Sequence, residues 1–155
     1  APLPAGLLVS GARAPQSRLN WTPPPEPTEA ELLAQVRRLE GLPEEALEDA
    51  ELIRLVLPAL RADTTLYRTY TYTEEEPLAC PIRAFGGEAD PNVRREDLEA
   101  WSQQTTAGFA LRTFPGGHFY LHTEPQFLPA LAGELAYVRS LSAGEPHGDS
   151  PVSSR

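Results

Sequence analysis

Two short stretches of the sequence carry an acid and a base that could work together. Asp90 lies in the stretch GGEADP, and His118 lies 28 positions later in PGGHF. Histidine can take up and return a proton near pH 7, and a neighbouring aspartate can fix its tautomer and stabilise the imidazolium. Glycines beside the histidine let the backbone pass close to a substrate. The pair therefore predicts general acid–base chemistry.

Both residues follow the carboxyl end of a predicted strand. PIRAFGG at 81–87 is expected to form a strand that runs into glycines just before Asp90. FALRTF at 109–114 is expected to form a second strand, which ends shortly before His118. Ligands of open α/β sheets bind at the edge formed by the carboxyl ends of the strands. We therefore expect the two side chains to meet at that edge.

Strand and helix patterns alternate through the second half of the chain. GLLVSG at 6–11 is typical of a strand buried on both faces, and 93–105 fits an amphipathic helix with Leu98 and Trp101 inward. Thr123 and Gln126 predict a capping box that starts a last helix. Its expected apolar face comprises Phe127, Leu131, Leu135 and Val138. Short connections between such elements predict parallel strands and an α/β fold.

The stretch between the first two strands has a helical pattern instead. Thr28 and Glu31 predict a capping box for a helix that Gly41 ends, with an apolar face made by Leu32, Leu33, Val36 and Leu39. A short acidic turn or helix is expected at 44–49 and a longer helix at 50–60, which Pro58 should kink or restart. Residues 61–73 suit either a strand or a continued helix. Residues 143–155 are predicted to be a disordered tail.

Composition narrows the possible functions. The chain has 155 residues, 41% of them hydrophobic, and a net charge of −9, which argues against nucleic acid or an anionic membrane as a partner. Cys80 is the only cysteine and no apolar run approaches the roughly 20 residues of a membrane span, so we expect a reducing, cytoplasmic setting. No ligand cluster calls for a metal or an organic cofactor.

Five motifs in order carry a resemblance to a known family. LLVSGARAP, LPALRAD, PLACPIRAFGGEADPNV, LEAWSQQT and FPGGHFYL together resemble the type II thioesterases that serve polyketide and nonribosomal peptide synthases. The resemblance implies the C-terminal part of an α/β-hydrolase fold, a mostly parallel sheet with flanking helices. It implies that Asp90 and His118 are the acid and base of a Ser–His–Asp triad. It also divides the chain into core (1–17), helical lid (18–77), core with the acid and base loops (78–142) and tail (143–155).

The chain departs from this family in one respect. The family's nucleophile lies in a G-x-S-x-G turn ahead of the first strand, and this sequence has no G-x-S-x-G. At about 30 residues per strand–helix–strand unit, roughly 100 residues of the fold are expected ahead of Ala1. We therefore expect a fragment that lacks its nucleophile and is inactive alone. Cys80 precedes a strand rather than following one, so it is not expected to replace the serine. His122 and His147 are given no role.

The resemblance implies hydrolysis of acyl groups from the phosphopantetheine thioester of acyl or peptidyl carrier proteins. A monomer is expected. Because carrier proteins are typically acidic, Arg61, Arg94 and Arg95 are candidates for a docking surface. Two alternatives stay open, namely another α/β-hydrolase, such as an esterase or acyltransferase, and a non-catalytic binding fragment.

Overall fold

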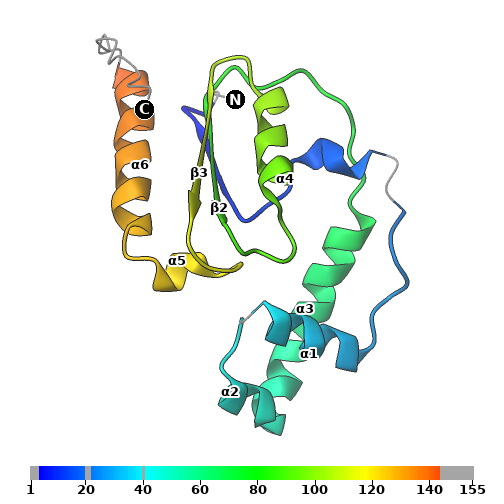
Figure 1. Cartoon of the computed structure of the whole chain (residues 1–155). Helices are drawn as coiled ribbons and strands as arrows, with labels where there is room; N and C mark the ends of the chain where they lie inside the picture. The colour runs from blue at the N-terminus through cyan, green and yellow to red at the C-terminus, as the bar shows by residue number, and fades with distance from the viewer. Residues whose placement is uncertain (1–3, 20–21, 40, 144–155) are drawn as a thin grey trace.

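The computed structural model describes residues 4–19, 22–39 and 41–143. Three strands form one parallel sheet in the order β1-β2-β3 (Figure 1). The paired residues run from Leu7 opposite Ile82 and from Ile82 opposite Phe109. These strands are β1 (Leu7–Ser10), β2 (Ile82–Gly87) and β3 (Phe109–Phe114). The prediction of three parallel strands is therefore confirmed.

The two outer strands differ from the central one in burial. In β2, Ile82 and Phe85 are 0% and 2% exposed, whereas Leu7, Leu8 and Val9 of β1 are only half-buried. The expectation that β1 is buried on both faces is thus wrong for the part of the chain that the structure describes. The reason is that β1 pairs there with β2 on one side only.

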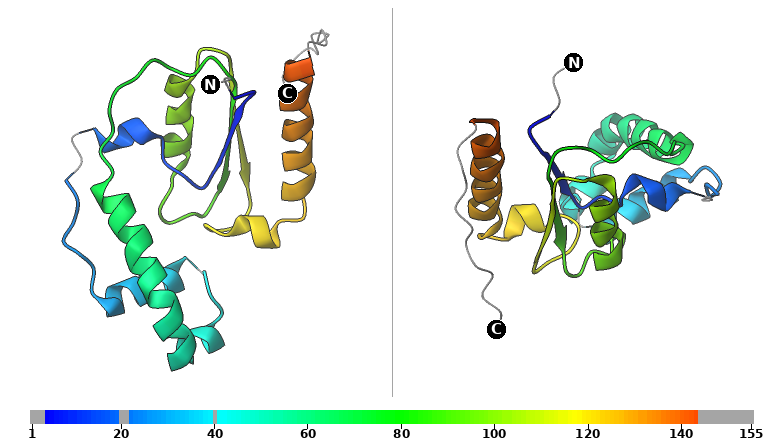
Figure 2. Two further views of the ribbon diagram at one scale, coloured as in Figure 1. Left: turned by 180° about the vertical axis from the view of Figure 1, so that it is seen from behind. Right: turned by 90° about the horizontal axis from the view of Figure 1, so that it is seen from above.

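Helices cover both faces of the sheet. In both Figure 1 and Figure 2, α6 (Phe127–Ala143) lies on one face and α4 (Arg95–Glu99) on the other. Leu98 of α4 is 1% exposed, and a Cβ atom on Gly86 would lie 2.3 Å from its Cδ1. The glycine therefore lets α4 close onto β2.

The helix predicted at 93–105 is present in two parts. After α4 the chain continues as the 3₁₀ helix η2 (Ala100–Gln104). Trp101 is half-buried there, and its indole N–H donates to the carbonyl of Ala12 at 2.9 Å. The second half of this helix thus holds the loop that follows β1.

The start of the last helix differs from the prediction. Thr123 ends the short helix α5 (Tyr120–Thr123), and the backbone N–H of Gln126 donates to the carboxylate of Glu124 at 2.9 Å. The capping box expected between Thr123 and Gln126 is therefore wrong, because Thr123 already belongs to another turn. Leu135 is 46% exposed, so it also falls outside the buried face of α6.

Three α-helices lie between β1 and β2 in sequence, beyond the carboxyl ends of the strands (Figure 1). The capping box at the start of α1 is confirmed, since Thr28 Oγ1 accepts from the Glu31 N–H at 3.3 Å and Glu31 Oε2 accepts from the Thr28 N–H at 2.8 Å. This helical insertion, preceded by η1 (Pro15–Arg18), consists of α1 (Glu29–Arg38), α2 (Glu44–Glu48) and α3 (Ala50–Thr69).

Helix α3 decides the choice left open for residues 61–73. It passes through Pro58 without a break and continues to Thr69, so the helical alternative holds and no new helix starts at the proline. Pro58 lacks the N–H that would donate to the backbone carbonyl of Arg54. Both residues are exposed, so water can donate a hydrogen bond to this carbonyl instead. Beyond Ala143, the predicted tail lies outside the described residues.

Replacing Leu98 tests the packing of α4 on the sheet. We expect Leu98→Ala to lower the free energy of unfolding by about 2–5 kcal/mol, because it leaves a cavity against β2. Leu55→Ala is the control, since Leu55 is 77% exposed on α3 and should change stability by less than about 0.5 kcal/mol. Denaturant unfolding measures both. Equal effects of the two variants would contradict the packing described here.

Candidate active site

The loop after β2 fixes the carboxylate of Asp90. Its Oδ1 accepts hydrogen bonds from the backbone N–H groups of Asn92 at 2.8 Å and Val93 at 3.2 Å. The Asp90 side chain is only 1% exposed. A buried carboxylate needs such donors. With Oδ1 occupied, Oδ2 is the oxygen left to face another group.

The loop after β3 lies directly against the loop after β2. The N–H of Ala89 donates to the carbonyl of Gly116 at 2.9 Å, and Gly116 has a φ of 111°, a conformation that favours glycine. A Cβ atom on Gly87 would lie 2.1 Å from the carbonyl oxygen of Gly117. The glycines of both loops therefore allow the close approach that brings Asp90 and His118 together.

His118 and Asp90 meet as the sequence predicts. His118 Nδ1 lies 2.7 Å from Asp90 Oδ2, and the imidazole is 26% exposed. An ionised carboxylate can only accept, so Nδ1–H donates to it and Nε2 is left to take up a proton. This is the arrangement that a histidine needs to act as a general base held by an aspartate.

Gly11, directly after β1, lies against the imidazole of His118. It has a φ of +56°, and a Cβ atom at this position would lie 3.3 Å from His118 Cε1. Its N–H donates to the carbonyl of Phe85 at 3.0 Å, which anchors the turn to β2. The chain thus passes close to the base without a side chain between them.

Tyr120 is a supporting residue that the sequence reasoning did not identify. Its hydroxyl lies 2.7 Å from Ser10 Oγ, while its ring is 1% exposed among Phe85, Phe114 and Phe127. Burial raises the pKa of its phenol above the ordinary value; the hydrogen bond with Ser10 opposes this rise in part, and the charge of Asp90 adds a smaller rise. The aromatic pair after His118 was the only sequence signal for this role.

A cavity of about 470 Å³ lies beside His118. Its walls come from the turn after β1, the loop after Asp90 and the helical insertion, so the insertion faces His118 across this space. The lining residues are Gly11, Ala12, Arg13, Gln35, Arg38, Leu39, Tyr67, Asn92, Val93 and His118. A bound group could therefore reach His118 under the insertion.

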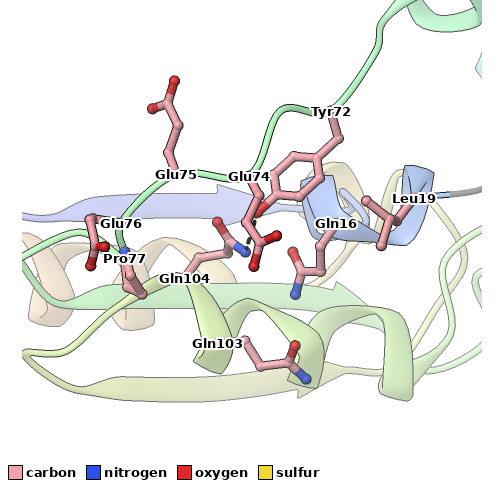
Figure 3. Close-up of a pocket in the computed structure, with 9 residues that line it drawn as sticks. All are labelled: Gln16, Leu19, Tyr72, Glu74, Glu75, Glu76, Pro77, Gln103 and Gln104. Carbon is pink, nitrogen blue, oxygen red and sulfur yellow. Dashed lines mark hydrogen bonds between the residues drawn. The ribbon is translucent and has the colours of Figure 1, made fainter.

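A larger cavity of about 890 Å³ lies elsewhere and contains neither Asp90 nor His118. Figure 3 shows its wall, in which a hydrogen bond joins Gln104 to Tyr72 and three consecutive glutamates, 74–76, lie on the irregular segment before β2. It offers no nucleophile or general base paired with an acid. Of these two cavities, only the smaller one is lined by His118.

The other residues considered from the sequence do not line the cavity beside His118, although Arg94 and Arg95 line a separate cavity together with Asp90. Cys80 is a buried free thiol before β2, and His122 is exposed on α5. Arg94 and Arg95 are both paired with nearby acids, Arg95 with Glu99 at 2.8 Å. Within the described ranges, no group of three or more histidine, cysteine, aspartate or glutamate residues could hold a metal ion.

The chain is similar to known proteins over most of its length. The model of the thioesterase domain family matches residues 2–136. The chain belongs to the thioesterase domain family. The family resemblance seen in the motifs is thereby confirmed, and so is the α/β-hydrolase fold class, since the solved thioesterases share this parallel sheet with flanking helices.

Two curated proteins illustrate the similarity in sequence. The gramicidin S biosynthesis protein GrsT of Aneurinibacillus migulanus is 40% identical over 122 residues, which are 77% of this chain and 46% of GrsT. The thioesterase PikA5 of Streptomyces venezuelae is 41% identical over 124 residues, 78% of this chain and 43% of PikA5. The chain thus spans about half the length of the curated relatives it matches.

Solved structures show the same pattern of coverage. RedJ, a thioesterase from the prodiginine pathway of Streptomyces coelicolor, has a TM-score of 0.76 and 34% identity over 89% of this chain and 54% of its own. The type II thioesterase BorB from the borrelidin cluster has a TM-score of 0.69 and 38% identity over 86% of this chain and 54% of its own.

Replacing Gly87 tests the contact between the two loops. We expect Gly87→Ala to lower the free energy of unfolding by about 1–3 kcal/mol, because the added methyl group would meet the backbone of Gly117. Gly133→Ala is the matched control, since a Cβ atom there meets nothing within 4 Å and alanine favours the helix. Denaturant unfolding compares them. A Gly87 variant as stable as the Gly133 variant would refute this contact.

The buried phenol of Tyr120 leads to a prediction at alkaline pH. Its folded-state pKa lies above the ordinary value of 10.0, so the folded protein holds this proton more tightly than the unfolded chain. The stability that this tighter proton binding contributes is fully present below pH 10 and is lost as the pH rises through the folded-state pKa. Tyrosinate absorbance should show one tyrosine that ionises above the ordinary pKa of 10.0, and Tyr120→Phe should remove that late step. A late step that persists in the variant would assign it to another tyrosine.

Proposed function

We propose that the protein hydrolyses acyl thioesters on the phosphopantetheine arm of carrier proteins, as an editing thioesterase of polyketide or nonribosomal peptide synthesis. The observation that carries the proposal is the 2.7 Å contact between His118 Nδ1 and Asp90 Oδ2 in a chain of the thioesterase family. The names of relatives such as GrsT and PikA5 support the biosynthetic setting.

In this proposal the nucleophile is a serine outside these 155 residues, because no G-x-S-x-G turn lies within them. His118 Nε2 takes the serine hydroxyl proton while the oxygen attacks the thioester carbonyl. The tetrahedral intermediate then breaks its carbon–sulfur bond, and His118 returns the proton to the leaving sulfur. Asp90 holds the imidazole and stabilises its protonated form throughout.

A water molecule completes the proposed cycle. His118 Nε2 takes a proton from water, whose oxygen attacks the acyl-serine ester. The bond between carbonyl carbon and serine oxygen breaks, and the proton returns to the serine. The net reaction converts a thioester and water into a carboxylic acid and a thiol, with no cofactor. Backbone donors for the oxyanion would come from the turn that holds the serine and from an earlier loop.

We further propose that residues 18–77 act as the lid of the acyl chamber. The insertion lines the cavity beside His118 with Leu39 and Tyr67, which could contact an acyl chain. The division of the chain into core and lid stays a prediction, as do the monomeric state, the cytoplasmic location and carrier docking at Arg61, Arg94 and Arg95. Within the residues that the structure describes, no helix has the length and apolar character of a membrane span.

Replacing the acid and the base in the full-length protein tests the proposal. We expect Asp90→Asn and His118→Ala each to lower kcat for an acyl-pantetheine thioester on the order of 10³–10⁴-fold, because either change removes the oriented base. His122→Ala should leave the rate unchanged, since that histidine is exposed and outside the cavity. Thiol release measured with a chromogenic thiol reagent follows the reaction.

Two outcomes would favour the alternatives to this proposal, namely another α/β-hydrolase or a non-catalytic binding protein. Faster turnover of oxygen esters than of acyl-pantetheine would assign the protein to esterases or acyltransferases. Failure of the full-length protein to react with a fluorophosphonate probe, together with no thioester hydrolysis, would favour a non-catalytic binding role.

A further inference from the structure

Asn92, two residues after Asp90, connects the acid to two other parts of the chain. Its backbone N–H donates to Asp90 Oδ1 at 2.8 Å. Its backbone carbonyl accepts from the guanidinium of Arg13, with Nε at 3.0 Å and Nη2 as a second donor. Its side-chain Oδ1 accepts from Arg38 Nη2 at 3.1 Å. Every one of these contacts restrains the residue that orients the acid.

Arg38 brings the helical insertion into this arrangement. It is the last residue of α1 and lies 54 positions from Asn92, so its hydrogen bond crosses from the insertion to the loop after β2. The insertion also reaches the loop after β3, since a Cβ atom on Gly41 would lie 3.1 Å from the ring of Phe119. That ring stands edge-on to His118, with 5.1 Å between centroids. The insertion therefore contacts both loops that hold the Asp90–His118 pair.

Two adjacent arginines of α1, Arg37 and Arg38, have different kinds of partner. Arg37 Nε lies 3.2 Å from the carboxylate of Glu44, an ordinary exposed ion pair within the insertion. Arg38 has no carboxylate oxygen within 4.0 Å among the described residues, although the chain carries a net charge of −9. Its hydrogen-bond partner among the described residues is the neutral side chain of Asn92. Both Arg38 and Asn92 line the cavity beside His118.

We propose that Arg38 is a positioning residue. Through Asn92 it holds the loop after β2, and with it Asp90, in place beside His118 while the insertion is packed against that loop. A charged donor on a neutral amide oxygen forms a stronger hydrogen bond than a neutral donor would. When the insertion moves away, Asn92 keeps its contact with Arg13 but loses the one from α1. Contact between the insertion and the loop after β2 thereby determines how firmly Asp90 orients the imidazole. The kinetic part of this inference rests on the proposed thioesterase function.

The test compares Arg38→Gln with Arg37→Gln in the full-length protein. We expect Arg38→Gln to lower kcat about 10-fold with KM little changed, because misplacing a reacting group can cost up to ~100-fold in rate. Arg37→Gln should keep both constants, since it removes only an exposed pair. Arg38→Lys retains one charged donor and should recover part of the lost rate. A rise in KM at constant kcat would overturn the proposal and assign Arg38 to substrate binding.

A spectroscopic readout tests the same inference without substrate. In histidine-labelled full-length protein, the Nδ1 proton of His118 gives a resonance whose exchange with water reports the bond to Asp90. Arg38→Gln should speed that exchange several-fold and Arg37→Gln should not. Unchanged exchange in Arg38→Gln would overturn the proposal even if the protein hydrolyses thioesters. Faster exchange in a protein without thioesterase activity would support the positioning role and contradict only the proposed function.

A double-mutant cycle identifies Asn92 as the intermediary. Asn92→Ala keeps the backbone N–H that Asp90 uses but removes the side-chain oxygen that Arg38 uses. If Arg38 acts through that oxygen, Arg38→Gln should have no further effect on kcat in the Asn92→Ala background. Additive effects of the two changes would show that Arg38 acts by another route and would refute the proposal.

Discussion

The hydrogen bond between His118 Nδ1 and Asp90 Oδ2, at 2.7 Å, is the interaction around which this part of the molecule is organised. It forms because β2 and β3 are parallel neighbours in register, so their carboxyl ends release two loops side by side. Parallel pairing brings consecutive loops to one edge of a sheet, which is where ligands bind in α/β folds. Gly87 and Gly116 then let the loops approach closely enough for the side chains to meet.

Several neighbouring groups restrict the geometry of this hydrogen bond. Backbone donors hold one oxygen of Asp90, and Gly11 after β1 lies against the imidazole. Tyr120 joins the end of β1 to the aromatic cluster under the loop of His118. All three strands thus contribute to one edge, and the orientation of the imidazole depends on packing as well as on the carboxylate. Preorganisation of this kind is what general base catalysis requires, since no rearrangement is then needed during the reaction.

The helical insertion contributes the remaining wall of the site. It contacts the loop after β2 through Arg38 and the loop after β3 through Gly41, and it faces His118 across a cavity of about 470 Å³. An element that both encloses the cavity and contacts the acid and base loops can link occupancy of the cavity to the geometry of the pair. The nucleophile proposed for the reaction would complete this edge from outside the 155 residues.

Local patterns in the sequence determined much of this arrangement, and long-range contacts decided the rest. The capping box of Thr28, the strand before Asp90 and the strand before His118 follow from spacing within a few residues, so the sequence alone predicts them. The capping box at Thr123 was wrong because that residue is taken up by a turn that starts at Tyr120.

The contacts of Tyr120 with Ser10 and of Arg38 with Asn92 join residues 110 and 54 positions apart, and no local signal predicts them. Spacing fixes which elements form and which edge they share. Only the packing of the sheet, its helices and the insertion decides which side chains meet there, because that choice depends on atoms distant in the chain being brought within hydrogen-bonding distance.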